Sequence, residues 1–341
     1  MRQAENLPDP APVLDLIEAF RRSKTMFAAV ALGVFDRLGE APADAATLAR
    51  AIGANLDALE RLLDASVGLG LLEKSGAVYS NRPVAVSYLL RSSPQNLTGY
   101  ILYSNRALYP LWEHLEDAVR EGTHRWKQTF GLQGSIFDGF FKTEEDKRDF
   151  LAAMHGFGLL SSPLVVRAFD LSGFRRLVDL GGGTGHLAIA ACERYAQLRA
   201  AIFDLPPVVE IARENVKLSQ VRDRVELIAG DFFADPLPEA DLYSLGRIVH
   251  DWSEKKIRAL LVKIYQRLPR GGALLIAEKL LREDKSGPVS AQMQSLSMLV
   301  CTEGKERAPS EYAALLGQVG FAEVQSRVTE APVDAVLAVK K

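Results

Sequence analysis

The amino-acid sequence predicts an α/β fold in which an open, mostly parallel sheet follows a helical N-terminal domain. Three observations indicate it. Apolar residues recur at helical spacing early in the chain, strand-like runs alternate with helical patterns from Phe174 onward, and a glycine-rich loop directly follows the first of these runs. The length of 341 residues suits more than one domain, because single domains cluster near ~100 to 200 residues.

The N-terminal domain, residues 1–100, is predicted to be helical. Apolar residues over 13–38 keep a helical period that is interrupted at Gly33. Two further helices are expected over 45–52 and 56–72, and short strand-like runs follow them. This succession of two helices and a hairpin is a winged-helix pattern.

A winged helix can bind DNA through its second helix, but the charges on that helix argue against it here. Its polar face carries Asp57, Glu60 and Asp64 against a single arginine, Arg61, so phosphate would be repelled. The net charge of −2 adds no basic field around the chain. We therefore expect a structural or dimer-forming use of this module and no nucleic-acid partner.

Residues 101–172 are predicted to be connecting helices, and they are rich in aromatic side chains. Aromatic rings can wall a pocket for a flat substrate, although most large aromatic side chains are buried for packing alone. The aromatic residues considered for such a pocket are Tyr103, Tyr109, Trp112, Trp126, Phe130, Phe137, Phe140 and Phe141.

Residues 173–341 are predicted to form the sheet domain. Helical patterns between successive strand-like runs imply a parallel sheet with helices on both faces. The last two runs lie too close together for a crossover helix, so they should pair antiparallel. The expected parallel strands are 177–180, 200–203, 225–229, 241–245 and 273–277, and the expected antiparallel pair is 322–328 with 335–339.

The first predicted strand leads into the loop Asp179-Leu180-Gly181-Gly182-Gly183-Thr184-Gly185. Glycine lets a backbone turn sharply and approach a ligand closely. A dinucleotide fingerprint fails because His186 occupies its sixth position, and no lysine follows as in triphosphate-binding loops. A nucleoside without a pyrophosphate remains as the ligand, and a glycine turn that binds nothing is the alternative.

Acidic residues end the next two predicted strands. Asp204 closes the second strand, where a carboxylate can accept hydrogen bonds from both ribose hydroxyls. Asp231 follows the third strand between Gly230 and Phe232, and it suits an adenine amino group with an aromatic ring beside it. Because ligands of open α/β sheets bind at the carboxyl ends of the strands, these residues predict one nucleoside site with Gly181 and Gly183.

The sequence resembles the caffeate-type and acetylserotonin-type small-molecule O-methyltransferases over nearly its whole length. The resemblance implies a helical dimer-forming N-terminal domain, a Rossmann-like class I methyltransferase sheet, and S-adenosyl-L-methionine as the cofactor, with S-adenosyl-L-homocysteine as product and no metal. The residues that carry it are 179–185, 203–206, 230–233, 235–238, Arg247-Ile248-Val249-His250-Asp251-Trp252, Gly271-Gly272 and Glu303-Gly304-Lys305-Glu306-Arg307.

The methyl group on a sulfonium is already activated, so the protein must supply an aligned acceptor oxygen and remove its proton. His250 follows the fourth predicted strand and is our candidate general base. The resemblance places Glu278 and Glu306 beside it, where a carboxylate can fix the imidazole tautomer. Surface ion pairs with Lys305 or Arg307 are the alternative for both glutamates. We assign no role to the other four histidines, His114, His124, His155 and His186.

The resemblance also assigns further ligand contacts. Arg247 matches a position that meets the cofactor, and Phe141 stands where the family has a tyrosine. Met154 and Asp251 match positions near the acceptor, although Met154 reads equally as a core residue and Asp251 as a cap of the helix that starts near Ser253.

Besides Phe141, the chain departs from the acetylserotonin-type pattern at three positions. Ser297 and Cys301 replace an asparagine and a glutamine that face the substrate, and Gly158 replaces a tryptophan. An acetamide group would then lose its partners, at a cost of roughly 1 to 3 kcal/mol per buried group. We therefore expect an aromatic acceptor with a hydroxyl but do not name acetylserotonin.

Two other functions stay open from the sequence: a winged-helix regulator that senses S-adenosyl-L-methionine, and a related enzyme that uses this cofactor for decarboxylation or hydroxylation. The retained His250 favours methyl transfer. The two cysteines, Cys192 and Cys301, lie far apart and suggest neither a disulfide nor a metal cluster. With no apolar window of roughly 18 residues and no targeting segment, we expect a cytoplasmic protein that does not bind membranes.

Overall fold

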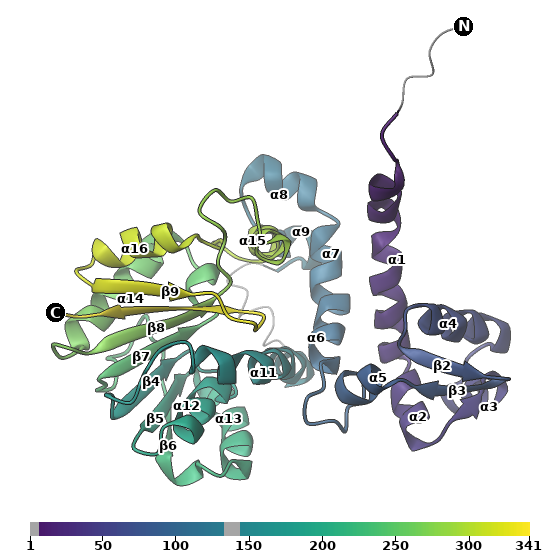
Figure 1. Ribbon diagram of the computed structural model, residues 1–341, viewed down its shortest axis with the longest axis horizontal. Helices are drawn as coiled ribbons and strands as arrows, with labels where there is room; N and C mark the ends of the chain where they lie inside the picture. The colour runs from purple at the N-terminus through teal and green to yellow at the C-terminus, as the bar shows by residue number, and fades with distance from the viewer. Residues whose placement is uncertain (1–6, 133–143) are drawn as a thin grey trace, which may run out of the picture. The chain divides into compact units, whose positions relative to one another are not determined.

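The computed structural model describes residues 7–132 and 144–341, and the chain forms two compact units, Met1–Asn105 and Arg106–Lys341 (Figure 1). The finer division into residues 1–100, 101–172 and 173–341 stays a prediction. None of the helices in residues 7–132 and 144–341 combines the length and the apolar composition of a membrane span.

The N-terminal unit packs helices around a small antiparallel sheet of order β1-β3-β2. Gly33, with φ 73°, separates the first two helices as the sequence predicts, and Asn55 caps α4 by accepting a hydrogen bond from the Ala58 N–H. The helix predicted over 56–72 ends at Gly68, because Leu72 begins a strand. The elements are α1 (Ala11–Ala31), α2 (Val34–Glu40), β1 (Ala43–Asp44), α3 (Ala45–Ile52), α4 (Leu56–Gly68), β2 (Leu72–Ser75), β3 (Val78–Asn81), α5 (Pro83–Tyr88) and α6 (Thr98–Tyr103).

The acidic face of α4 is engaged by its own unit. Asp64 accepts hydrogen bonds from Lys74 of β2 and from the Tyr79 hydroxyl of β3, both at 2.7 Å, and the Lys74 bond lowers the pKa of Asp64. Asp57 pairs with Arg61 at 2.6 Å. Asp64 is therefore a structural link between α4 and the hairpin rather than only a solvated charge.

The larger unit contains a seven-stranded sheet of order β6-β5-β4-β7-β8-β10-β9. Its first five strands are parallel, and β10 runs antiparallel to both β8 and β9, so the predicted hairpin is confirmed. The strands are β4 (Arg176–Leu180), β5 (Arg199–Asp204), β6 (Val225–Ala229), β7 (Leu242–Gly246), β8 (Ala273–Glu278), β9 (Ala322–Arg327) and β10 (Asp334–Val339).

Helices cover both faces of this sheet (Figure 1). On one face α12 and α13 pack with the end of α11, and on the other face α14 and α16 pack, each face having its own apolar core. The long helix α15 contacts α7 and α8 beyond the sheet. The helices are α7 (Tyr109–Trp112), α8 (Leu115–Glu121), α9 (Trp126–Phe130), α11 (Glu144–Val165), α12 (His186–Arg194), α13 (Pro206–Leu218), α14 (Glu254–Arg267), α15 (Val289–Cys301) and α16 (Pro309–Gly317).

The strand order reverses between β4 and β7. After β4 the chain builds outward to β5 and β6, and it then returns to place β7 on the other side of β4. Loops at such a switch point separate, which leaves a crevice at the carboxyl ends of the strands where ligands bind. The glycine loop follows β4 and His250 follows β7, so both border this crevice.

Candidate active site

The glycine loop is held against the ends of β5 and β7. Gly181 has φ 66°, and a Cβ on it would lie 2.6 Å from Ile248 Cδ1 and 3.2 Å from the Phe232 ring. No other residue fits there without strain and displacement. The Gly181 N–H donates to the Phe203 carbonyl at 2.8 Å. The loop therefore lies directly against the residue that the sequence assigned to an adenine ring.

Asp204 fastens this loop to the second strand end. Its carboxylate accepts hydrogen bonds from the backbone N–H of Gly183 at 2.8 Å and of Leu205 at 2.7 Å. Burial raises the pKa of Asp204 to about 6, although the two N–H donors act in the opposite direction and lower it. Each carboxylate oxygen keeps a further lone pair, so the predicted bonds to ribose hydroxyls remain available.

The third strand end lies at the same edge. Gly230 donates its N–H to the Asp204 carbonyl at 2.9 Å, and a Cβ on Gly230 would meet the Phe203 ring at 2.5 Å. Asp231 Oδ1 accepts a hydrogen bond from the Phe233 N–H at 2.8 Å. Thus Gly181, Gly183, Asp204, Gly230, Asp231 and Phe232, all predicted to meet a cofactor, come together.

Asp179, which opens the glycine loop, was given no separate role by the sequence. Its side chain is buried, and the Ser244 hydroxyl of β7 donates to Oδ1 at 2.6 Å. Burial raises the pKa of Asp179 to about 7. This pair links the two strands that flank the switch point.

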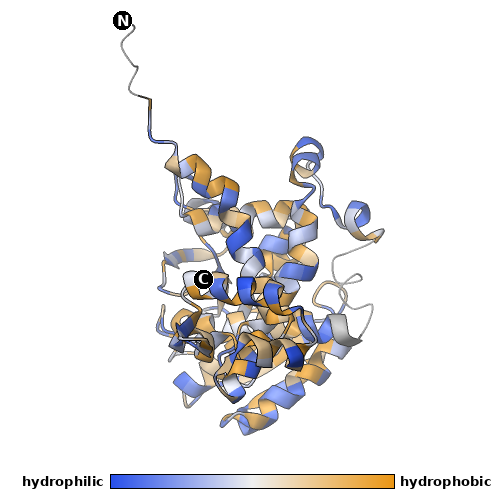
Figure 2. Ribbon diagram, turned by 90° about the vertical axis from the view of Figure 1, so that its right-hand side faces the viewer, coloured by the Kyte–Doolittle hydropathy of each residue, from blue (hydrophilic) through white to orange (hydrophobic). Residues whose placement is uncertain are grey.

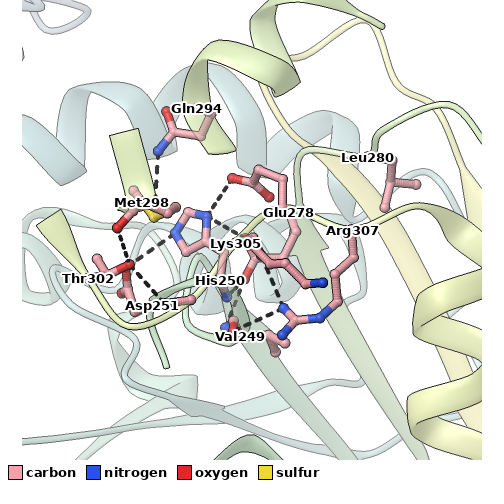
Figure 3. A network of polar contacts seen from close by, with 12 residues as sticks. Val249, His250, Asp251, Glu278, Leu280, Gln294, Met298, Thr302, Lys305 and Arg307 are labelled. Carbon is pink, nitrogen blue, oxygen red and sulfur yellow. Dashed lines mark hydrogen bonds and ion pairs between the residues drawn. The ribbon is translucent and has the colours of Figure 1, made fainter. Parts of the chain in front are cut away.

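His250 lies in the short helical turn η3 (Val249–Asp251), and buried carboxylates surround its side chain (Figure 3). Its Nδ1 lies 2.6 Å from Glu306 Oε1 and 3.0 Å from Glu278 Oε2. Glu278 Oε1 accepts hydrogen bonds from the backbone N–H of Val249 at 2.9 Å and of His250 at 3.3 Å. Glu278 thereby fixes both the backbone and the ring of the predicted base.

The alternative assignment of the two glutamates to surface ion pairs is wrong. Glu278 and Glu306 are buried, with 0% and 1% exposure. Arg307 donates to the backbone carbonyls of Val249 and Lys305 at 3.4 and 3.1 Å. Lys305 instead lies 3.7 Å from Glu311. Both carboxylates therefore face the His250 imidazole rather than Lys305 or Arg307.

Gly304 allows the Glu306 loop to reach His250. A Cβ at this position would lie 2.2 Å from the His250 carbonyl oxygen. The neighbouring Glu303 N–H donates to the Asp251 carbonyl at 3.1 Å, which ties the two loops together. The sequence alone does not show why a glycine is needed at position 304, because the close contact arises only where the two loops meet.

The negative charges around His250 stabilise the protonated form of its imidazole. Burial by itself would lower the pKa of His250, but Glu278, Glu306 and Asp251 raise it well above its ordinary value. Burial raises the pKa of Glu306, and it raises that of Asp251 to about 6. Asp251 Oδ1 lies 3.7 Å from His250 Nε2, the nitrogen that Glu278 and Glu306 leave open.

The same three side chains could hold a metal ion. Ligand atoms of His250, Glu278 and Glu306 lie within 4.8 Å of one another. Their separations at Nδ1 are those of charge-assisted hydrogen bonds. The expectation that no metal is required stays a prediction.

The residues predicted to face the acceptor differ in burial and in secondary-structure element. Ser297 and Cys301 are buried on α15, Cys301 interacts with the charge of Asp251, and burial raises the pKa of the Cys301 thiol to about 12. The Trp126 indole N–H donates to the Cys301 carbonyl at 2.7 Å. Met154 lies half-buried on α11. Phe141 lies outside the described residues.

Asp251 does not cap the next helix as the alternative assignment held. The N-cap of α14 is Ser253, and no side chain bonds there. Asp251 is directed to the imidazole instead, at the 3.7 Å separation given above.

Two histidines to which the sequence assigned no catalytic role flank the glycine loop. His155 Nδ1 lies 2.8 Å from the Thr184 hydroxyl, and His186 Nδ1 lies 2.8 Å from the Ser162 hydroxyl. A Cβ on Gly158 would lie 2.3 Å from the His186 ring. The His186 ring therefore occupies the space that a tryptophan at position 158 would need.

Comparison with known proteins agrees with this geometry. Residues 112–322 match the model of the O-methyltransferase domain family, and residues 14–91 match that of the O-methyltransferase dimerisation domain. Acetylserotonin O-methyltransferase of Gallus gallus is 42% identical over 99% of each chain.

Two solved structures share the fold closely. The crystal structure of human N-acetylserotonin methyltransferase in complex with SAM has a TM-score of 0.93 and 39% identity, and the match covers 99% of each chain. A structure described as PigF with SAH has a TM-score of 0.88 and 30% identity, covering 97% of this chain and 100% of that chain.

Proposed function

Because the chain belongs to the O-methyltransferase family, we propose that His250 is the general base of its methyl transfer. The chain is an S-adenosyl-L-methionine-dependent O-methyltransferase that acts on an aromatic small molecule. Bound S-adenosyl-L-methionine supplies an activated methyl group on its sulfonium. The residues around His250 must then hold the acceptor hydroxyl and receive its proton.

One observation carries this assignment: two buried carboxylates meet the same imidazole nitrogen. Nδ1–H donates to Glu306 at 2.6 Å, and Glu278 Oε2 lies 3.0 Å from the same nitrogen, so the lone pair of the neutral ring stays on Nε2. That nitrogen can take the proton of a hydroxyl as its oxygen attacks. The imidazolium that results is stabilised by the two carboxylates, as in a catalytic triad.

The described residues fit the nucleoside cofactor. A side chain larger than hydrogen at Gly181 would meet Phe232 and Ile248, so the loop backbone can lie against a ligand. We assign Asp204 to the ribose hydroxyls, Asp231 and Phe232 to the adenine, and Arg247 to the amino-acid part. Gly183, Gly230 and Phe141 complete the proposed cofactor set.

The acceptor is proposed to be a flat aromatic molecule with a hydroxyl, near Met154, Asp251, Ser297 and Cys301. The names of several relatives specify acetylserotonin as their substrate. Here a serine hydroxyl and a protonated thiol offer weaker partners to an acetamide than side-chain amides do. We therefore infer a preference for phenols, hydroxyindoles or hydroxyquinones without that group.

His250→Ala tests the base directly. Methyl transfer to a panel of such acceptors should fall by at least about 100-fold, because positioned proton transfer contributes roughly 10² to 10⁴ in rate. Calorimetry should give a nearly unchanged affinity for S-adenosyl-L-homocysteine. Equal turnover in the variant would refute the base assignment. A product that has lost carbon dioxide or gained oxygen would instead favour decarboxylation or hydroxylation.

We also infer that two copies of the chain associate through α1. Large apolar side chains are exposed on this helix, including Leu16 at 74%, Ile17 at 59% and Phe20 at 53%. Figure 2 shows hydrophobic and hydrophilic residues along the same helix. Burying such a face against a second copy removes it from water. Light scattering should give a dimer for the native chain and a monomer for Leu16→Glu. A native monomer would contradict the inference.

A further inference from the structure

Lys263 of α14 donates hydrogen bonds to the backbone of the loop that follows β6. Its Nζ lies 2.9 Å from the Phe232 carbonyl oxygen and 3.3 Å from that of Phe233, and it also donates to the Asp235 carbonyl. An ammonium group has three N–H donors and no acceptor, so these bonds use its full capacity. A charged donor also makes each bond stronger than a bond between neutral groups. One half-buried side chain therefore holds three carbonyls of this loop.

The N–H groups of the loop are paired within the loop itself. Asp235 Oδ2 accepts the Asp231 N–H at 2.8 Å, and Asp231 Oδ1 accepts the Phe233 N–H at 2.8 Å. The N–H groups of Ala234 and Asp235 both donate to the Asp231 carbonyl, at 3.1 and 2.7 Å. Because the loop uses its own N–H groups in this way, the carbonyls that face α14 need donors from another element.

The position of this loop decides where two aromatic rings lie. The Phe232 ring is the one that a Cβ at Gly181 would meet at 3.2 Å, so it lies against the glycine loop. Phe232 and Phe233 meet edge to face with ring centroids 4.7 Å apart, and Phe233 meets Trp252 in the same way at 5.0 Å. A shift of the loop backbone would therefore move the Phe232 ring relative to Gly181.

A second cation of α14 holds the other end of the connection between β6 and β7. Arg267, one turn after Lys263, donates to the Leu237 carbonyl and to the Glu239 carboxylate, both at 3.1 Å. The two cations thus divide the connection between them. Lys263 holds the end that lies next to the proposed adenine site.

We propose that Lys263 is a positioning residue that makes the cofactor site selective for adenine. The proposal rests on the proposed function, which assigns Asp231 to the adenine amino group and Phe232 to the ring face. Contact residues of a binding site keep their geometry only when a further set of interactions supports them. The three bonds of Lys263 provide that support, because they fix the backbone on which the carboxylate and the ring are placed.

Calorimetry with two nucleosides tests the base selectivity. S-adenosyl-L-homocysteine carries the adenine amino group, and S-inosyl-L-homocysteine has an oxo group in its place. The native chain should prefer the adenine ligand, because the inosine ligand would turn an oxygen toward the Asp231 carboxylate and leave it unpaired. Lys263→Met should weaken S-adenosyl-L-homocysteine by about fivefold, as expected for one misplaced aromatic contact, and leave the inosine ligand nearly unchanged.

Enzyme kinetics should show the same separation. KM for S-adenosyl-L-methionine should rise in Lys263→Met, whereas kcat at saturating cofactor and its pH dependence should stay near native, because the carboxylates around His250 are unaltered. Lys263→Arg keeps a long charged donor and should restore most of the affinity. Lys263→Gln should give an intermediate loss, so the test does not depend on the folding of one variant.

Lys340→Met is the matched control. Lys340 Nζ also donates to two backbone carbonyls, those of Tyr265 and Leu268, both at 2.7 Å. It lies at the opposite edge of the sheet, where β8 begins. Its replacement should leave the ratio of the two affinities native, whatever its effect on thermal unfolding.

Two results would overturn the proposal. One is a ratio of affinities in Lys263→Met that stays within about twofold of the native ratio, and the other is an equal fall of that ratio in Lys340→Met. Phe232→Ala separates this failure from a failure of the adenine assignment. If Phe232→Ala weakens S-adenosyl-L-homocysteine and Lys263→Met does not, only the role of Lys263 is wrong. If neither variant weakens it, the proposed adenine site is wrong as well.

Discussion

Glu306→Gln removes one negative charge from the imidazole while keeping the size of the side chain. In the native chain Glu306 Oε1 accepts the His250 Nδ1–H at 2.6 Å, in a position with 1% exposure. A hydrogen bond to a charged partner contributes about 1.5 to 3 kcal/mol, whereas a neutral one contributes about 0.5 to 1.5 kcal/mol. The imidazolium formed during the reaction should therefore lose about 1 to 2 kcal/mol, a reduction of roughly 5- to 30-fold in kcat.

The pH profile gives a second readout of the same variant. Carboxylates raise the pKa of His250, and only the neutral ring can act as base. Activity in the native enzyme should therefore rise with pH through that raised pKa. With Glu306 uncharged the pKa of His250 falls, so the acidic limb of kcat/KM should move to lower pH while the plateau decreases.

Glu303→Gln is the matched control for this change. It makes the same substitution three residues away, where Glu303 bonds to Lys256 at the surface at 2.6 Å, and it should leave kcat and the pH profile unaltered. If Glu306→Gln kept native kcat, or moved the acidic limb to higher pH, the assigned role of the carboxylate would be wrong.

Three further predictions concern packing, buried charge and metal. Gly158→Ala should destabilise the protein by about 1 to 3 kcal/mol, because its Cβ would lie 2.3 Å from the His186 ring, whereas Gly173→Ala, which has open space, should be nearly neutral in thermal unfolding. Burial raises the pKa of Asp179 from 3.8 to about 7 in the folded state. Its contribution to folding stability is therefore fully present below pH 4 and is lost as pH rises through 7. Asp179→Asn should accordingly raise Tm at pH 8 and change it little at pH 4. Dialysis against a chelator should leave methyl transfer intact, and activity that only a divalent cation restores would show that the His250 cluster holds a metal.

The fold could be predicted from local patterns to within a few residues of each strand. Strand-like runs, the break at Gly33 and the glycine loop are all short-range signals. The place of β10 between β8 and β9 could not be predicted in the same way. Proximity along the chain shows that the last two strands pair, but it does not show which of them adds to the parallel part of the sheet.

The candidate site, like the fold, could be predicted from the sequence only in part. Asp204 and His250 could be found because they follow strands, and parallel strands bring their carboxyl ends to one edge. The bonds of His155 and His186 depend on how closely α11 packs on α12, which the glycine at position 158 permits. A glycine inside a helical pattern is a signal for such close packing, but the sequence does not say which side chain fills the space.

Glu278 and Lys279 show how one strand end places adjacent side chains in different surroundings. Successive residues of a strand point to opposite faces, and here Glu278 reaches His250 while Lys279 reaches Phe157 on α11. Exchanging the two residues should abolish methyl transfer even though composition and net charge are unchanged, because an ammonium group would then replace the Glu278 carboxylate that lies 3.0 Å from His250 Nδ1. Native turnover in the exchanged variant would refute the role assigned to Glu278.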